Sequence, residues 1–242
     1  MPVRREPANP DPFEPVNRGL FRLGHALDDA IGRPLARTYL AILPRPVRKG
    51  VHRALSNADE PGVAVNDLLQ GRFGAGGRTL VRFIANTTIG VAGLFDPATK
   101  AGLPHHDNGF GKTLGRYGAP QGPYLYLPLL GPSTLRNAIG GGLDFAADPL
   151  SLPSYHHAAI VNVARTSVAL LDARAGANHQ IETLYQTATD PYATVRSVYL
   201  QYEASSGGEA EPPLDDLPEF PSATEDQAGS DKSPSTAPGS QP

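Results

Sequence analysis

The stretch from Asn108 to Asp144 constrains the fold of this 242-residue chain more than any other segment. Glycines recur at five positions within residues 109–122, and more follow at Gly131 and at residues 140–142. The apolar run PYLYLPLL lies between these two groups of glycines. So much Gly and Pro excludes one continuous helix, and so many apolar residues are not typical of a solvated linker. We therefore expect a tightly bent segment in which backbones approach closely.

The remainder of the chain before residue 203 has the pattern of short amphipathic helices. Apolar residues recur at helical spacing from Val16 to Ile31, and Gly32–Pro34 predicts a break after them. Further helices are expected at Leu35–Leu43, Leu80–Val91, Leu135–Leu143 and Tyr155–Arg174, after Asp96, and from Pro191 onward. The segment Asn57–Gly71 is expected to be a turn followed by a helix with Pro61 at its start. The only strand-like segment is Pro120–Leu130, which could form part of a hairpin. The sequence predicts an all-α protein of short, broken helices.

Charge divides the chain at Glu203. Nine of the 24 acidic residues but only one of the 21 basic residues lie from Glu203 onward, which leaves residues 1–202 with a net charge of about +5. The acidic segment is rich in Ser, Gly, Pro and Ala, so it cannot bury enough apolar surface to offset the entropy of ordering. We therefore expect a disordered N-terminal extension (1–10), one helical domain (11–202) and an acidic disordered tail (203–242).

Two basic features each allow two interpretations. The densest basic stretch runs from Arg33 to Arg53 without one acidic residue, and it is either a solvated helix face or a contact for lipid headgroups. Arg78 and Arg82 are one turn apart on a strongly apolar helix. They either face solvent or bury their stems in an apolar layer and lift the guanidinium groups to water. The most apolar window, Thr79–Phe95, is too short for a conventional membrane span.

Motifs of catalysis are missing from the sequence. It contains no GxSxG elbow, no P-loop, no HExxH and no cysteine. The histidine pairs 105–106 and 156–157 supply one metal ligand each at best, because adjacent residues on a helix point about 100° apart. Ser133 is better explained as a helix N-cap than as a nucleophile. We therefore expect no enzyme, no metal site and no cofactor, and the basic stretch lacks the interleaved aromatics of a nucleic-acid interface.

Several segments resemble one known family. The block FGKTLGRYGAPQGPYLYLP followed by GPSTLR is similar to the signature of the MlaA/VacJ family of outer-membrane lipoproteins. The other similar segments, in the order of the family, are DPFEPVNRGLF, RPLARTY, EPGVAVNDLLQG, RFIANTTIGVAGLFDPA and DPYATVRSVYLQ. The resemblance covers the chain from about Asp11 to Gln201.

This resemblance implies a fold and a function. It implies that the helices form a ring, or doughnut, in the inner leaflet of the outer membrane, around a central amphipathic channel. Such a protein removes phospholipid from the outer leaflet and hands it to a soluble periplasmic lipid carrier while docked to a trimeric porin, which maintains lipid asymmetry without catalysis. The implied location is the periplasmic side of the outer membrane. A ring is physically reasonable, since interrupted backbone at membrane depth must be buried in protein or line a wet cavity.

The resemblance also implies roles for particular residues. The loop thought to gate the channel matches Tyr117–Pro123, with Gly118 and Gly122 as its flexible positions. Pro120 stands where a glycine is expected and should stiffen the loop. Gly24 and His25 match a segment of the first helix that helps to hold the channel in its resting state, although Gly24 replaces an expected polar residue.

Three polar residues, Arg136, Asn137 and Asp144, are candidates for lining the passage, and alternatively they satisfy helix ends.

Family members ordinarily begin with a secretory signal that ends in a lipid-carrying Cys. The present N-terminus, MPVRREPANPDPFEP, has no apolar signal region, so the resemblance does not imply how this chain is anchored. The alternative function is a soluble helical periplasmic scaffold or a phospholipid-acting enzyme, in which the apolar stripes are ordinary core.

Overall fold

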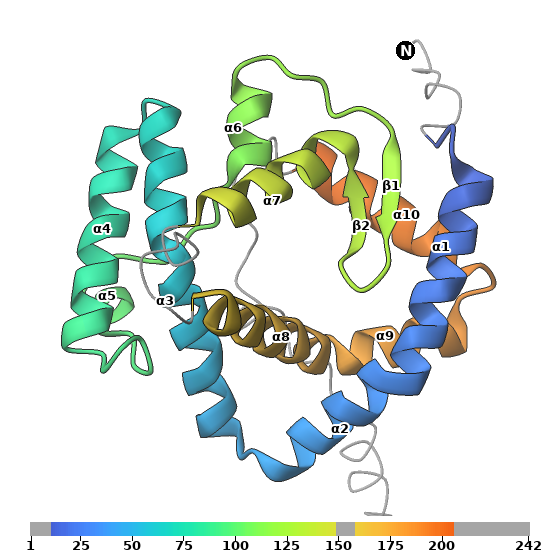
Figure 1. Ribbon diagram of the computed structural model, residues 1–242, viewed down its shortest axis with the longest axis horizontal. Coiled ribbons are helices and arrows are strands. Elements are labelled where there is room, and N and C mark those ends of the chain that lie inside the picture. The colour runs from blue at the N-terminus through green and yellow to red at the C-terminus, as the bar shows by residue number, and fades with distance from the viewer. Residues whose placement is uncertain (1–10, 149–157, 206–242) are drawn as a thin grey trace, which may run out of the picture. The chain divides into compact units, whose positions relative to one another are not determined.

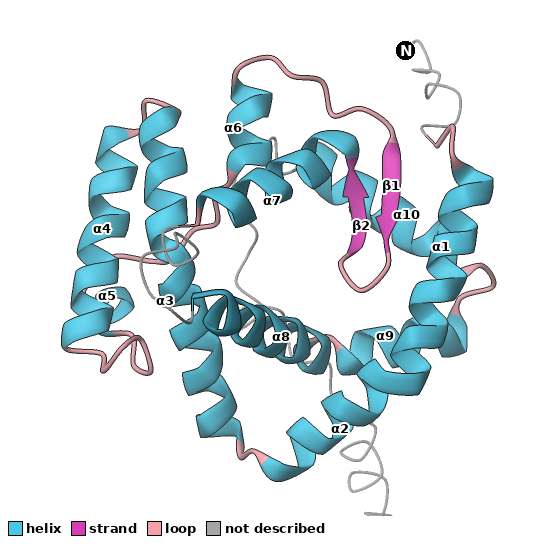
Figure 2. Ribbon diagram, in the orientation of Figure 1, coloured by secondary structure: helices cyan, strands magenta, loops and turns pink. Residues whose placement is uncertain are grey.

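The computed structural model describes residues 11–148 and 158–205, which are mainly helical (Figures 1 and 2). The first half contains α1 (Glu14–Leu27), the π-helix η1 (Asp28–Gly32), α2 (Arg33–Ile42), α3 (Arg45–Leu69), α4 (Phe73–Thr88) and α5 (Pro97–Lys100). The second half contains α6 (Phe110–Arg116), β1 (Tyr124–Leu127), β2 (Gly131–Thr134), α7 (Leu135–Ala147), α8 (Ala158–Gly176), α9 (Asn178–Thr187) and α10 (Pro191–Ser205). The predicted helical class is confirmed. The N-terminal extension and most of the acidic tail lie outside the described residues.

The predicted break at Gly32–Pro34 is wrong, because the chain passes from α1 to α2 through η1 without leaving a helical conformation. The backbone N–H of Arg33 donates to the carbonyl of Asp28, five residues earlier, as in a π-helix. Pro34 falls in the first turn of α2 and does not interrupt the helical conformation. The predicted helices from Val16 and from Leu35 therefore form one continuous helical segment.

Helix α3 begins at Arg45 and has 25 residues, whereas the sequence predicted a turn from Asn57 and a helix with Pro61 at its start. Pro44 is extended and precedes the helix, while Pro46 lies in its first turn, a position that tolerates proline. Pro61 lies inside the helix without ending it. Helix α4 packs along α3 and starts at Phe73, so the chain between the two helices is short and turns at Gly71, which has φ +74° (Figure 1).

The Gly-rich stretch contains the hairpin that the sequence suggested. Strands β1 and β2 pair antiparallel, with Tyr124 opposite Thr134 and Leu127 opposite Gly131. The second strand lies beyond Leu130, where the predicted excursion ended. Ser133 belongs to this strand, so the prediction that it caps α7 is wrong. Thr134 caps the helix instead, since its hydroxyl accepts a hydrogen bond from the backbone N–H of Asn137 at 3.3 Å.

One side chain of α1 binds the outer edge of β1. Asn17 is fully buried, and its Nδ2 donates to the carbonyl of Tyr124 at 3.0 Å. The backbone N–H of Tyr126 donates to Asn17 Oδ1, also at 3.0 Å. A residue of a neighbouring strand would make the same two bonds. Nδ2 also donates to Asp11 at 2.8 Å, so the residues before α1 are tied into the same contact.

An aromatic cluster joins α1, the hairpin and the last two helices. Phe21, Tyr124 and Tyr192 are buried. Their rings meet edge-on, with centroids 5.6 Å apart between Phe21 and Tyr192 and 6.2 Å apart between Tyr124 and Tyr192.

Helix α10 continues through Ser205, so residues 203–205, which we assigned to the tail, are helical. Glu203 holds this last turn because it accepts a hydrogen bond from Asn137 at 3.0 Å.

Candidate functional site

The described residues bury polar groups and expose apolar ones, which reverses the usual order of a water-soluble protein. Eight apolar residues are buried, and four of them are alanines, whereas 13 polar or charged residues are buried. The buried polar residues are Asp11, Asn17, Asn57, Glu60, Asn66, Asp67, Gln70, Thr79, Arg82, Asn86, Thr113, Ser133 and Thr134. Because each buried polar group needs a partner, the interior is held by hydrogen bonds more than by apolar packing.

Large apolar side chains of the described residues are exposed on α1–α4, α7, α8 and α10. Thirty of them are exposed, including Phe73 at 72%, Ile89 at 74% and Ile42 at 69%. Water-soluble monomers rarely expose apolar surface on this scale, and larger patches mark contact with protein or membrane. Within the described ranges, no helix is both long and apolar enough to cross a membrane.

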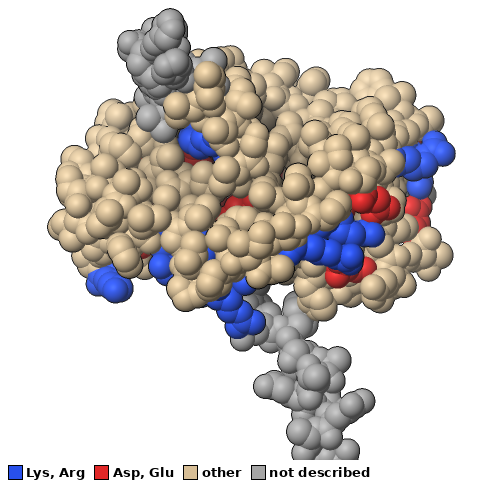
Figure 3. Space-filling model, turned by 60° about the horizontal axis from the view of Figure 1, so that its bottom comes forward, with Lys and Arg blue, Asp and Glu red and all other residues tan. Residues whose placement is uncertain are grey.

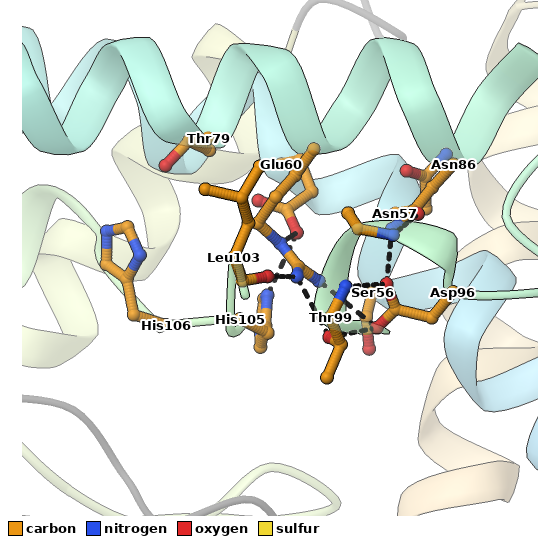
Figure 4. A network of polar contacts seen from close by, with 12 residues as sticks. Ser56, Asn57, Glu60, Thr79, Asn86, Asp96, Thr99, Leu103, His105 and His106 are labelled. Atoms are coloured by element: carbon orange, nitrogen blue, oxygen red, sulfur yellow. Dashed lines mark hydrogen bonds and ion pairs between the residues drawn. The ribbon is translucent and has the colours of Figure 1, made fainter. Parts of the chain in front are cut away.

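The interface between α3 and α4 contains the densest part of the polar interior (Figure 4). Asn57, Glu60 and Asp67 face α4 from α3, and Thr79 and Arg82 face α3 from α4, while the buried Asn86 of α4 bonds to Asp96 and to the backbone of Ala98. Each set recurs at spacings of three, four or seven residues, which places it on one side of its helix. The two helices thus meet through their polar faces, which leaves the apolar face of α4 exposed.

Arg82 is the centre of this interface. Its side chain is 4% exposed, and its Nε donates to Glu60, itself 1% exposed, at 2.8 Å. Its remaining nitrogens donate to Thr99 at 3.0 Å, to Asp96 at 3.4 Å and to the carbonyl of Leu103. Burial alone would raise the pKa of Asp96, but hydrogen bonds from Thr99 and the charge of Arg82 lower it. Both interpretations of Arg82 from the sequence, facing solvent or facing headgroups, are therefore wrong.

The histidine pair 105–106 binds carboxylates of α3. His105 Nδ1 lies 3.1 Å from Glu60 and its Nε2 lies 3.0 Å from Asp107. Burial alone would lower the pKa of His105, yet the hydrogen bonds with Asp107 and Glu60 raise it to about 9. His106 Nε2 lies 2.8 Å from the fully buried Asp67. The described residues contain no group of three or more His, Asp or Glu suited to a metal ion, and the pair at 156–157 lies outside them.

A pocket of about 350 Å³ adjoins this interior, between α3, α7, α8 and the segment that leads into α6. Asp144 lines it and accepts hydrogen bonds from the backbone N–H of Phe110 at 3.0 Å and from Asn66 at 3.1 Å. Burial raises the pKa of Asp144. Arg165 closes another side and forms ion pairs with Asp59, at 2.8 Å, and with Asp148. The pocket therefore has charged walls that are largely paired.

The two other candidates for the passage lie elsewhere. Arg136 and Asn137 occupy the first turn of α7 and do not line this pocket. Asn137 donates to the hydroxyl of Tyr199 at 3.1 Å and to Glu203, and Arg136 lies 3.8 Å from the same Glu203. These contacts join α7 to α10. Of the three residues that we proposed together, only Asp144 lines the pocket, and a role in a passage stays a prediction for all three.

The predicted loop and the predicted resting-state segment both border the hairpin. Gly118 and Gly122 have φ of +88° and +72°, values that favour glycine, and the exposed Pro120 lies between them. Gly24 is packed so closely under the hairpin that an added Cβ would lie 3.1 Å from the ring of Tyr126. His25 stacks on Tyr185 with ring centroids 4.0 Å apart. A movement of the hairpin would therefore change the surroundings of Gly24.

These features define a class of protein: a helical protein that shields polar side chains inside and presents apolar side chains to its surroundings. The family model described as "MlaA lipoprotein" matches residues 9–206. The chain belongs to the MlaA lipoprotein family, as its signature segments predicted.

Relatives and one solved structure agree with this assignment. The chain is 34% identical over 211 residues to the intermembrane phospholipid transport system lipoprotein MlaA of Escherichia coli, covering 84% of this chain and 81% of that protein. It is 36% identical over 188 residues to a protein of Rickettsia felis, covering 77% and 74% of the two chains. A solved structure from work on the maintenance of bacterial outer membrane lipid asymmetry has a TM-score of 0.68 and 34% identity, covering 79% of this chain and 96% of that one.

Proposed function

We propose that this protein is a non-catalytic component of phospholipid transport that removes phospholipid from the outer leaflet of the outer membrane. Its apolar helical faces lie in the inner leaflet, on the periplasmic side, and the lipid passes through a channel inside a ring of helices. The protein then hands the lipid to a soluble periplasmic carrier, which maintains lipid asymmetry. The names of the relatives support phospholipid and the membrane as partners.

The reversed distribution of side chains is the observation that carries this proposal. In hydrocarbon, an exposed apolar side chain loses nothing, whereas an unpaired polar group is costly, so the favourable arrangement is polar inside and apolar outside. The soluble alternative needs the opposite arrangement. It also needs a nucleophile and a base if it is to act on phospholipid, and the polar groups around Arg82 pair with one another instead.

The passage itself is proposed from the loop, the hairpin and the pocket. The lipid headgroup would pass the polar wall at Asp144, while Arg136 and Asn137 would hold the neighbouring helix end in place. Gly118 and Gly122 would let the loop bend, and Pro120 would limit how far it moves. Gly24 and His25 would hold the hairpin in its resting position from α1.

The partners in transfer are proposed from the implied position in the membrane. A protein that lies in the inner leaflet reaches the outer leaflet only beside a partner that spans the membrane, and a trimeric porin is such a partner. A soluble carrier is needed at the other side because a phospholipid does not cross water alone.

Membrane flotation tests the proposal. The full chain is mixed with vesicles of phosphatidylethanolamine and phosphatidylglycerol, floated through a density gradient, and the lipid bound to the recovered protein is analysed. We expect the chain in the vesicle layer, and bound phospholipid after extraction in mild detergent. Recovery of a lipid-free, monodisperse chain in the aqueous layer would refute the proposal.

A pair of variants adds a control. Phe73→Gln with Ile84→Gln makes two exposed apolar positions of α4 polar. It should weaken flotation if α4 faces lipid and leave it unchanged if α4 faces water. Arg78→Gln, which is also exposed on α4, changes a side chain that is already polar and should float like the unchanged chain. Equal flotation of all three proteins would show that the face of α4 does not contact lipid.

A further inference from the structure

The first turns of α3 carry basic side chains along one face. Arg45, Arg48, Lys49, His52 and Arg53 follow one another at spacings of three, four, seven and eight residues from the first. On a helix these positions form a single stripe. We call these five residues the basic stripe. Helix α3 thus has two different halves: a basic stripe at its start and the buried polar face that contacts α4 at its end.

Most basic residues of the stripe have no acidic partner among the described residues, unlike several arginines elsewhere in the chain. Arg37, Arg165 and Arg174 each pair with a carboxylate. Arg45, Lys49 and Arg53 make no ion pair or hydrogen bond within the parts of the chain that the structure describes.

The two remaining members of the stripe are placed by local contacts. Arg48 donates to the backbone carbonyl of Leu43 at 3.0 Å, so its charge is not neutralised by this bond. His52 turns toward α8, where its Nδ1 lies 2.9 Å from Asp172. The carboxylate of Asp172 is therefore shared by His52 and by the hydroxyl of Tyr39, which lies 2.8 Å away. Asp172 forms no ion pair with the lysine or the arginines of the stripe among the described contacts, so these residues keep their positive charge.

Exposed apolar side chains surround the stripe. Ile42 and Val47 are 69% and 48% exposed at the corner between α2 and α3. Gly50, one residue after Lys49, is buried against Leu94, so the exposed apolar loop 89–95 lies beside the same part of α3. Figure 3 turns this corner forward and shows Lys and Arg side chains along the lower part of the face. Unpaired cations beside apolar side chains are typical of helices in the interface of an anionic membrane.

We propose that the basic stripe binds the phosphate groups of an anionic lipid surface and sets the depth and tilt of this corner in the membrane. This inference rests on the proposed function only in taking the membrane as the partner. Guanidinium and ammonium groups bind phosphate oxygens, and the flanking apolar side chains enter the acyl region just below them. The protein should therefore prefer anionic lipids to zwitterionic ones.

Vesicle binding tests the proposal with the full chain. One set of vesicles contains phosphatidylethanolamine and phosphatidylcholine, and in the other part of this lipid is replaced by phosphatidylglycerol. The variant Arg45→Gln, Lys49→Gln, Arg53→Gln removes three unpaired charges and no described contact. Each basic residue near an anionic surface contributes about fivefold to binding, so the variant should bind the anionic vesicles about 100-fold more weakly. Its binding to the zwitterionic vesicles should not change.

A matched control removes the same charge elsewhere. Arg22, Lys100 and Arg116 are exposed on α1, α5 and α6, and their replacement by Gln should change binding to anionic vesicles much less. Added salt should weaken the binding of the unchanged chain to anionic vesicles and should hardly affect the stripe variant. Circular dichroism checks that both variants keep the helical content of the unchanged chain.

The outcomes separate the two proposals. A selective loss in the stripe variant supports the basic stripe as a lipid contact. Equal losses in the two variants would overturn it and leave only a general effect of net charge. Full anionic binding by the stripe variant would also overturn it, and the stripe would then be assigned to an acidic protein surface. Failure of the unchanged chain to bind any vesicle would overturn the proposed function as well.

Discussion

Replacement of Arg82 tests whether hydrogen bonds hold the interior together. Arg82→Met keeps the length of the side chain but removes its bonds to Glu60, Asp96, Thr99 and the carbonyl of Leu103. Breaking a buried ion pair from one side costs about 3–5 kcal/mol, because the partner charge stays buried. The remaining contact of Glu60 with His105 offsets part of this cost. We therefore expect the free energy of unfolding to fall by about 3 kcal/mol.

Denaturant unfolding in mild detergent, followed by far-ultraviolet circular dichroism, measures this loss. Arg78→Met is the control, since Arg78 lies one turn earlier on α4, is exposed, and donates only within its own helix in the described contacts. It should change the free energy of unfolding by less than about 0.5 kcal/mol. If Arg82→Met also costs less than about 1 kcal/mol, the polar network is not what stabilises the α3–α4 interface.

Three further predictions concern pH, the hairpin and the loop. Because the pKa of His105 is raised to about 9, its contribution to stability is full below pH 6.5 and is lost as pH rises through about 9; His105→Gln should flatten this dependence in unfolding curves recorded across the range. Gly24→Ala should destabilise the hairpin by about 1–3 kcal/mol and speed its amide exchange, whereas Gly19→Ala, which has open space, should be neutral or stabilising. Pro120→Gly should lower the free energy of unfolding by about 0.5–1 kcal/mol, because glycine gives the unfolded chain more freedom, and it should speed amide exchange in residues 117–123. Unchanged exchange would show that Pro120 does not stiffen the loop.

Local patterns in the sequence predicted most of the helices, but not all of their ends. Asp96 and Asp190 begin helices as predicted, since the carboxylate of each accepts a bond from a backbone N–H three residues later. Asp11 does not, although it also precedes a proline. The first helix begins at Glu14, and the carboxylate of Asp11 binds Asn17 instead, 2.8 Å away. A side chain that lies six residues later and is itself bound to β1 thus replaced a local cap, and the sequence alone cannot show such a choice.

The direction of the polar faces was the main feature that the sequence left undecided. The spacing of Asn57, Glu60 and Asp67, and that of Thr79, Arg82 and Asn86, is visible in the sequence and could have shown that α3 and α4 share a polar interface. The sequence left two interpretations open: apolar stripes that form an ordinary core, which is the rule for a protein in water, or apolar faces that contact the membrane. The rule reverses when the surroundings are apolar, and helical periodicity shows that two faces differ without showing which one is inside.

The pairing of Asn17 with β1 has a consequence for how this protein avoids unwanted association. An open strand edge is a template on which another polypeptide can add, and a two-stranded hairpin has two such edges. The amide of Asn17 occupies the bonding groups of Tyr124 and Tyr126 on one of them. A foreign strand would have to expel a buried side chain before it could dock there. A single asparagine therefore hinders the addition of a foreign strand at this edge of the hairpin.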